Sequence, residues 1–340
     1  MLDIRFVREH LDEVATAMQN RNHTWDSARF QELDESRRAS IAKEEELQAK
    51  RNAISKSIGK LMGEGKKEEA EAAKAEVSEL KNQIAQFSAE RAAADEGLRD
   101  MLMSTPNMPA DSTPVGKDED DNPEVRRWGT PRNFEAEGFE MKPHWDLGAE
   151  LGIIDAERAV KLAGSRFVLL GGLGARLERA LINFMADTHI SRGYKEWWCP
   201  AMANATTLTG TGQLPKFEDD LFKTREGMYL IPAAEVQLTN IHSGEVLEAS
   251  ELPLKYCAFT PCFREEAGSA GRDTRGLIRV HQFDKVEMFV YAKQEDSYKE
   301  HEHLLAMEQE MLGKVEVPYR IIDTAAGDLG SSAARKFDCE

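Results

Sequence analysis

The residues with the clearest chemical potential lie in one arginine-rich and glycine-rich stretch between two apolar runs. Its sequence is CFREEAGSAGRDTRGLIRVHQF, from Cys262 to Phe283. Guanidinium groups bind phosphate oxygens through paired hydrogen bonds and stay charged at every physiological pH. A hairpin that carries several arginines therefore suits a polyphosphate ligand. Because the stretch matches neither the GxxxxGK[ST] phosphate loop nor the GxGxxG fingerprint, a P-loop or Rossmann site is not indicated.

Strands are expected on both sides of this loop. The first leads into Arg264 and Glu266, which are two residues apart and should share a strand face. The second is predicted over residues 277–291. A helix is predicted over residues 176–185 and a short strand over 228–231. Strands without regular β-α-β crossovers indicate an α+β domain built around an antiparallel sheet.

The first hundred residues have a different pattern. Residues 1 to about 24 read as one short amphipathic helix. From about residue 30 to 103 there is no proline, and leucine, isoleucine and valine recur at heptad spacing on both sides of Gly63-Glu64-Gly65. Two such helices joined by a glycine-containing turn predict an antiparallel coiled-coil hairpin, each arm reaching ~45 Å at 1.5 Å per residue. Its lysines and arginines alternate with glutamates, so this surface alone does not indicate RNA.

Three regions follow from these patterns. Residues 1–103 form the coiled-coil domain and residues 134–340 the α+β domain. Residues 104–133, rich in Pro, Asp, Asn and Gly, are predicted to be a linker.

Composition limits the remaining possibilities. The chain is acidic, with a net charge of -17, which disfavours indiscriminate nucleic-acid binding but allows a local basic surface that binds nucleic acid. The spacing of its cysteines and histidines fits no metal site, so no protein-bound metal is expected. The start of the chain has no apolar signal-peptide run and no segment is suited to span a bilayer, so a cytoplasmic protein without a membrane partner is expected.

The stretch from Cys262 to Phe283 resembles motif 2 of the class II aminoacyl-tRNA synthetases, and its loop is similar to that of seryl-tRNA synthetases. Other parts fit the same family in order along the chain. They are the opening MLDI, the coiled-coil arm, residues 114–129, the motif 1-like residues 193–200 and the loop TGTGQLPKF at 209–217. The resemblance implies an N-terminal helical arm and a class II catalytic sheet flanked by helices. It also implies serine–tRNA ligase activity, which activates L-serine with ATP and transfers serine to tRNA(Ser) and to tRNA(Sec).

The resemblance also implies roles for individual residues. Arg264 would bind the ATP α-phosphate and the serine carboxylate, and Glu266 would accept from the adenine amino group; both count as catalytic. Phe283 would stack under the adenine. The implied ATP site comprises Arg264, Glu265, Glu266, Val280, His281, Gln282 and Phe283. The implied serine site comprises Ala233, Ala234, Glu235, Arg264 and Glu287.

Partners are implied in the same way. Arg272, Arg275 and Arg279 would meet the acceptor end of tRNA or ATP phosphates. Lys50, Arg51 and Lys56 of the arm would contact the body of tRNA(Ser). Mg²⁺ would accompany ATP, and the family forms homodimers through motif 1.

The chain departs from the family pattern at two places. Ala233 stands where the family has a threonine that begins its serine-binding loop, and loss of its hydroxyl would weaken serine binding by ~1 kcal/mol. The family also has a further strand, a second serine-side segment and motif 3 beyond the point that corresponds to Glu340. The sequence is therefore expected to be part of a longer enzyme, and activity of these 340 residues alone is in doubt.

Two other interpretations stay open on the sequence. The departures favour a synthetase-like protein that binds tRNA or nucleotide without catalysis. Retention of Arg264, Glu266, Phe283 and Glu287 opposes it. A coiled-coil scaffold with an incidental globular part would leave the arginine-rich hairpin unexplained.

Overall fold

The computed structural model describes residues 1–267 and 275–340 of the chain. These residues form two compact units. The first contains Met1–Pro123 and Thr324–Lys336, and the second contains Glu124–Asp323 and Phe337–Glu340. Within the described ranges, no helix has both the length and the apolar character needed to cross a membrane.

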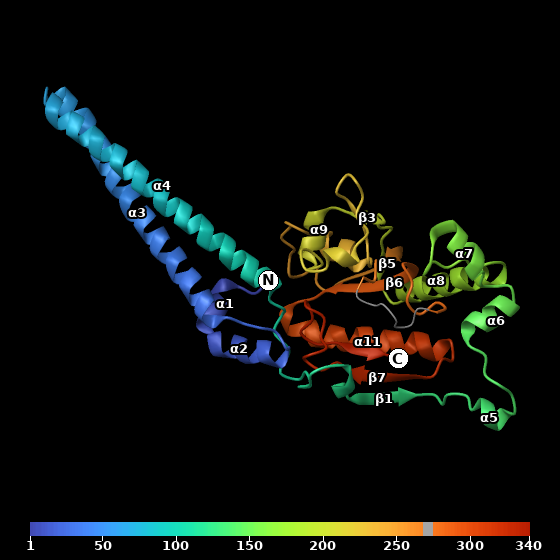
Figure 1. Cartoon of the computed structure of the whole chain (residues 1–340). Coiled ribbons are helices and arrows are strands. Elements are labelled where there is room, and N and C mark those ends of the chain that lie inside the picture. Colours follow the sequence, from blue (N-terminus) through green and yellow to red (C-terminus); the bar gives the residue numbers. More distant parts are fainter. Residues whose placement is uncertain (268–274) are drawn as a thin grey trace. The chain divides into compact units, whose positions relative to one another are not determined.

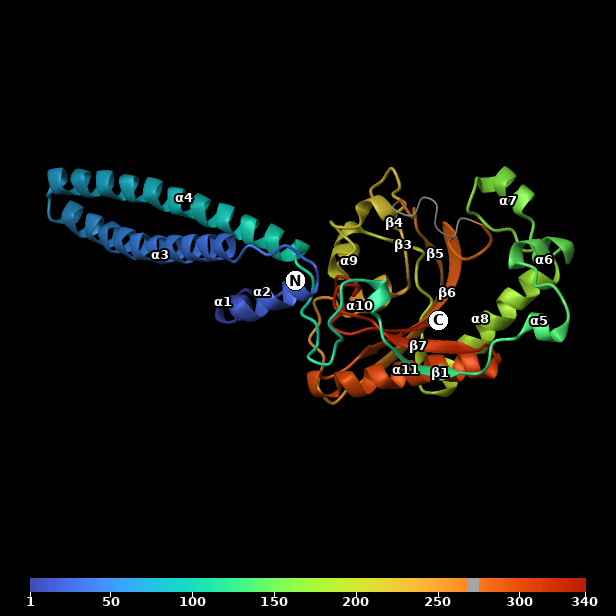
Figure 2. The same cartoon turned by 60° about the horizontal axis from the view of Figure 1, so that its bottom comes forward.

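The first unit is dominated by a long helical hairpin, as predicted. Helices α3 (Ser27–Gly63) and α4 (Lys67–Ser104) run antiparallel and side by side (Figures 1 and 2). Gly65 in the turn has φ of 76°, a left-handed conformation that glycine adopts without steric cost. The heptad residues Leu33, Leu80 and Leu98 are buried, so the apolar repeat does form the seam between the two helices.

The base of the hairpin packs on two short helices, α1 (Ile4–Glu9) and α2 (Leu11–Asn20). They bury Val7, Val14 and Met18 against residues of α3 and α4. The prediction of one continuous helix here was wrong. His10 stacks on Phe6, with ring centroids 4.6 Å apart, and its φ of -130° interrupts the helix.

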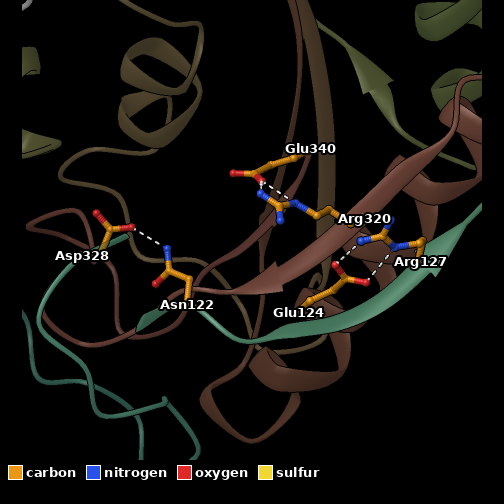
Figure 3. A network of polar contacts seen from close by, with 6 residues as sticks. All are labelled: Asn122, Glu124, Arg127, Arg320, Asp328 and Glu340. Carbon is orange, nitrogen blue, oxygen red and sulfur yellow. Dashed lines mark hydrogen bonds and ion pairs between the residues drawn. The ribbon is translucent and has the colours of Figure 1, made fainter. Parts of the chain in front are cut away.

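Residues Thr324–Lys336 are fastened into the first unit by a buried arginine. The side chain of Arg21, only 7% exposed, donates to the carbonyl oxygens of Leu329, Gly330 and Ala333 at 2.7–3.0 Å, and to that of Asn107. Asn122 Nδ2 adds a 2.9 Å bond to Asp328 Oδ2 (Figure 3). Along the chain, this segment of the first unit connects Asp323 to Phe337, which both belong to the second unit.

The second unit contains the antiparallel hairpin that the arginine-rich stretch predicts. Strand β5 (Leu254–Phe263) pairs with β6 (Gln282–Tyr291), and β2 (Lys195–Glu196) runs parallel to β5. The second strand was expected from residue 277 but begins at Gln282. Gly276, with φ of 80°, and the turn that follows it keep residues 275–280 out of the ladder.

A second sheet has the order β1-β7-β8, formed by Glu124–Trp128, Tyr319–Asp323 and Phe337–Cys339. Strand β1 lies within residues 104–133, which were predicted to be a linker. The composition of that segment did not indicate a strand. Figure 3 shows the charged pairs along this sheet, Glu124 with Arg127 and Arg320 with Glu340. Trp128 stacks on Tyr319 across the β1–β7 pair, with ring centroids 5.7 Å apart.

Helices cover these sheets. Helix α8 (Leu173–Ser191) contains the predicted helix and contacts β5 and β6, while α11 (Ser297–Lys314) packs Leu305 against Tyr319 and Ile321 of β7. The remaining helices are α5 (Phe134–Glu137), α6 (His144–Glu150), α7 (Ala156–Ala163), α9 (Ala205–Gly210) and α10 (Glu235–Asn240). The remaining strands are β3 (Met202–Ala203) and β4 (Tyr229–Leu230), and short 3₁₀ turns occupy Glu119–Asp121, Glu218–Asp220 and Gln294–Asp296.

Candidate active site

Arg264 lies immediately after β5 and is held by its neighbours on the returning strand. Its backbone N–H donates to the carbonyl oxygen of His281 at 2.9 Å, and His281 Nδ1 donates back to the Arg264 carbonyl oxygen at 2.9 Å. The guanidinium carbon lies 4.9 Å from the ring centroid of Phe283. A cation over an aromatic face is stabilised by the ring quadrupole. The chain therefore presents Arg264 and Phe283 together.

Glu266 does not share a strand face with Arg264, contrary to the sequence prediction. Strand β5 ends at Phe263, and Glu266 has φ of 53°, which is unusual for a residue other than glycine. Its carboxylate accepts from Arg279 Nη1 at 2.8 Å and lies 4.0 Å from Arg166 Nη2. The side chain is only 15% exposed, so the ion pair is largely shielded from water.

Arg166 was missed by sequence reasoning. It also has positive φ, 63°, and its carbonyl oxygen accepts from the His281 backbone N–H at 2.9 Å. It reaches the hairpin from a loop before α8, and no spacing in the sequence signals this contact. Arg166 therefore contacts residues on both sides of the arginine-rich loop, Glu266 before it and His281 after it.

The start of that loop is fixed by Asp220. The Glu265 backbone N–H donates to the Asp220 carbonyl oxygen at 2.9 Å, and the Ala267 N–H donates to Asp220 Oδ1 at 3.1 Å. Glu265 itself is half-buried. Of the three arginines predicted to meet tRNA or phosphate, Arg272 lies outside the described residues, whereas Arg275 and Arg279 lie on the returning limb.

A cavity of about 260 Å³ lies beside Phe283. Its lining includes the predicted residues Val280, Gln282 and Phe283, together with Phe167, Val168, Leu170, Glu178, Leu277 and Asp284. Burial raises the pKa of Glu178 and of Asp284, and the negative charge of Asp284 adds to the shift at Glu178. His281 is not part of the lining. Its ring packs near Phe167 and Phe222, with centroids 5.3 and 5.9 Å away.

The predicted serine residues gather around β6 and the start of α10. Burial raises the pKa of Glu235, the first residue of α10, and repulsion from Glu287 raises it further. Lys285 and Arg264 act in the opposite direction on Glu235. Ala233 and Ala234 are buried just before the helix. The charges of Glu287, Lys285 and Arg264 thus lie near enough to Glu235 to affect its pKa.

Lys285 is the residue of this group that sequence reasoning missed. Its Nζ lies 2.7 Å from Glu287 Oε2. The signal was available, because Phe283, Lys285 and Glu287 alternate along one strand and must share a face. Among the residues described, no group of His, Cys, Asp or Glu side chains is arranged to hold a metal ion.

The predicted tRNA residues of the arm lie on α3. Lys50 Nζ pairs across the hairpin with Glu76 at 2.9 Å, Arg51 donates to its neighbour Asn52, and Lys56 is exposed. These contacts are those of a solvated helical surface.

Family models match both ends of the chain. Residues 1–109 match the seryl-tRNA synthetase N-terminal domain, and residues 216–340 match the tRNA synthetase class II core domain (G, H, P, S and T). The serine–tRNA ligase of Listeria monocytogenes serotype 4a (strain HCC23) is 50% identical over all of this chain, which covers 79% of that protein. That of Geobacter sp. (strain M21) is 48% identical, with 80% of it covered.

Solved structures give the same result. The seryl-tRNA synthetase of Pyrococcus horikoshii, complexed with ATP, superimposes with a TM-score of 0.91 at 36% identity, over 100% of this chain and 80% of that one. The cytoplasmic serine–tRNA ligase of Naegleria fowleri, in complex with AMP, gives 0.87 at 27% identity, over 100% and 81%. With half of its residues identical to those of the Listeria relative, the chain belongs to the seryl-tRNA synthetase family.

Proposed function

We propose that the protein is an ATP-dependent, AMP-forming serine–tRNA ligase. It activates L-serine to seryl-adenylate and transfers serine to the 3′ end of tRNA(Ser) and of tRNA(Sec). The observation that carries the proposal is the pairing of Arg264 with Phe283 next to the Glu235, Lys285 and Glu287 group. A phosphate-binding cation and an aromatic platform lie beside carboxylates that suit an amino acid's ammonium.

In the first step, a serine carboxylate oxygen attacks the α-phosphorus of ATP and pyrophosphate leaves with the electron pair of the broken P–O bond. Arg264 offsets the negative charge that builds on the phosphoryl oxygens and orients the serine carboxylate. Glu266 accepts from the adenine amino group while Phe283 stacks under the ring. Positioning and electrostatics account for such a reaction without covalent participation by the protein.

Glu235 and Glu287 bind the serine ammonium, and Glu287 also reaches the hydroxyl. Hydrogen bonding to the hydroxyl rejects alanine, because buried polar groups would be left unpaired, whereas threonine is excluded by lack of space. In the second step the ribose 3′-hydroxyl of tRNA attacks the seryl carbonyl carbon and AMP leaves.

Mg²⁺ is proposed to arrive bound to the phosphates of ATP. Among the described residues, no cluster of three or more His, Cys, Asp or Glu side chains could hold a metal ion. Magnesium in such sites takes much of its coordination from the substrate phosphates and water. No step of the proposed mechanism depends on a protein-held metal.

The arm, with Lys50, Arg51 and Lys56, is proposed to bind the body of tRNA by its shape, while Arg275 and Arg279 meet the acceptor end. Homodimer formation through motif 1 is proposed from the resemblance. It is supported by α8, the helix that precedes the motif 1-like residues 193–200, where Leu173, Leu177 and Leu181 are exposed at helical spacing. Trp198, which follows β2, is 88% exposed.

The proposed location is the cytoplasm, as the name of the N. fowleri relative states for that enzyme.

The direct test is charging of tRNA by the full-length protein, with labelled serine, ATP and purified tRNA(Ser). The proposal predicts ATP-dependent serine ester at the tRNA 3′ end, and none with a tRNA that accepts another amino acid. Binding of tRNA and ATP without ester formation would instead support a non-catalytic synthetase relative.

A further inference from the structure

Helix α6 contacts the returning limb of the arginine-rich loop at two points. His144 Nε2 accepts a 2.8 Å hydrogen bond from the backbone N–H of Leu277. One residue along α6, the ring of Trp145 lies under Arg275, whose guanidinium carbon is 5.2 Å from the ring centroid. Neither aromatic residue was among the predicted site residues.

Gly276 makes this close approach possible. A Cβ at this position would lie 1.9 Å from His144 Nε2 and 2.9 Å from Trp145 Cε3. Its φ of 80° is also a conformation that other residues rarely adopt. The limb therefore passes against α6 along a path that only glycine permits.

The contact fixes residues that face the proposed ATP site. Leu277 and Val280 line the cavity beside Phe283, and Arg279 pairs with Glu266 at 2.8 Å. Leu277 both donates the hydrogen bond to His144 and lines the cavity. Movement of its backbone would therefore change the cavity wall and the position of Arg279 relative to Glu266.

Core packing does not explain the two aromatic residues. Helix α6 has seven residues, and among them only Gly148 is buried. Asp146, Leu147, Ala149 and Glu150 are exposed, so the helix contributes little apolar burial. Its most specific contacts are those made by His144 and Trp145.

We infer that His144 and Trp145 form a clamp that positions the limb from Arg275 to Val280 for ATP. They are positioning residues, because they act through Leu277, Arg279 and Val280 and do not touch the reacting atoms. Holding the limb in place before ATP arrives lowers the entropic cost of ordering it on binding. The inference rests on the proposed function for the identity of the nucleotide.

The test separates the hydrogen bond from the volume of the side chain. His144→Leu removes the acceptor at similar size, and in His144→Gln the amide oxygen can replace Nε2. Asp146→Asn, on the exposed side of the same helix, is the matched control. Each full-length variant is measured for amide hydrogen exchange in a peptide that contains Leu277, and for KM values of ATP and serine in pyrophosphate exchange.

For His144→Leu we expect faster exchange at Leu277 and an ATP KM raised about fivefold, as the loss of one hydrogen bond predicts. The serine KM should stay within about twofold of wild type. His144→Gln and Asp146→Asn should resemble wild type in all three measurements. Trp145→Leu should raise the ATP KM by about two- to threefold, and Trp145→Phe by less.

The clamp is contradicted if exchange at Leu277 accelerates in His144→Leu while the ATP KM is unchanged, or if His144→Gln is as impaired as His144→Leu. Equal rises in the ATP and serine KM values would contradict it as well. If wild type shows no serine-dependent exchange, the proposed function fails. The clamp is then decided by hydrogen exchange and by calorimetric titration of the same variants with ATP.

Discussion

The guanidinium of Arg264 lies over the ring of Phe283, 4.9 Å from its centroid, although the two residues belong to the opposite ends of the arginine-rich loop. The register of the hairpin explains the contact. Cys262 is paired with Phe283, so the residue two positions past Cys262 lies close to the aromatic ring. The phosphate-binding and adenine-binding residues of the proposed site therefore form one structural unit.

Arg264→Gln should lower kcat for serine-dependent pyrophosphate exchange by at least about 100-fold, because the charge that offsets the phosphoryl oxygens is lost. Arg264→Lys keeps the positive charge but loses the planar guanidinium with its paired donors. Its kcat should therefore lie between those of wild type and Arg264→Gln. Steady-state exchange kinetics measure the effect. Arg225→Gln, at an exposed arginine of the same unit, should leave kcat unchanged. Wild-type kcat in Arg264→Gln would remove this residue from the mechanism.

The serine affinity should depend on the protonation of Glu235. Burial and the charge of Glu287 raise the pKa of Glu235, so in the free protein it takes up a proton more readily than an exposed carboxyl. The serine ammonium favours the ionised carboxylate. Binding therefore strengthens as pH rises through the raised pKa, and the serine KM increases as pH falls through it.

Serine KM values between about pH 5 and 8 check this dependence. Glu235→Gln should give a high serine KM that no longer changes with pH in this way. Glu226→Gln, at an exposed glutamate, should keep the wild-type profile. A Glu235→Gln variant with the wild-type KM and pH profile would show that Glu235 does not bind the ammonium.

Restoring a hydroxyl at position 233 should improve serine binding. Ala233→Thr is expected to lower the serine KM about fivefold, since one hydrogen bond contributes ~1 kcal/mol. Ala233 is 5% exposed, so the added atoms must also be accommodated. Ala233→Val has nearly the same shape without the hydroxyl and measures that cost alone. If the threonine and valine variants have equal serine KM values, the hydroxyl has no role.

The arm can be shortened without disturbing its base. Arg8 of α1 pairs with Asp34 of α3, and Arg37 of α3 pairs with Asp95 of α4. Replacing residues 41–90 with a short Gly-Ser turn keeps both pairs. Charging of tRNA(Ser) should fall by at least about 100-fold while exchange stays within about twofold of wild type, because shape-based recognition is lost. Equal loss of both activities would count against a separate tRNA-binding role.

Much of this architecture follows from local sequence signals. The proline-free heptads predict α3 and α4, and the apolar runs around the arginine-rich loop predict β5 and β6. Helix α8 follows from its amphipathic period. These elements repeat one pattern over many residues, so a single irregular position does not change the prediction.

The errors arise where a distant partner or one backbone angle decides the structure. Strand β1 forms because β7 pairs with it. Its five residues, EVRRW, are all exposed, so no buried face marks them as a strand in the sequence. Positive φ at Glu266 turns its side chain away from the strand face expected from spacing. Arg166 and His144 reach the loop only through the tertiary fold. The family resemblance, in contrast, depended on the order of the motifs along the chain. That order can be read without knowing backbone angles or tertiary contacts.

The most direct test of the central claim is ATP–pyrophosphate exchange by the full-length protein with serine, alanine or threonine as the amino acid. Serine should support exchange, alanine should be rejected by about 10³-fold or more because it leaves the hydroxyl's partners unpaired, and threonine should fail for lack of space. Exchange that does not depend on serine, or none from folded protein that binds ATP, would contradict the assignment as a serine-activating enzyme.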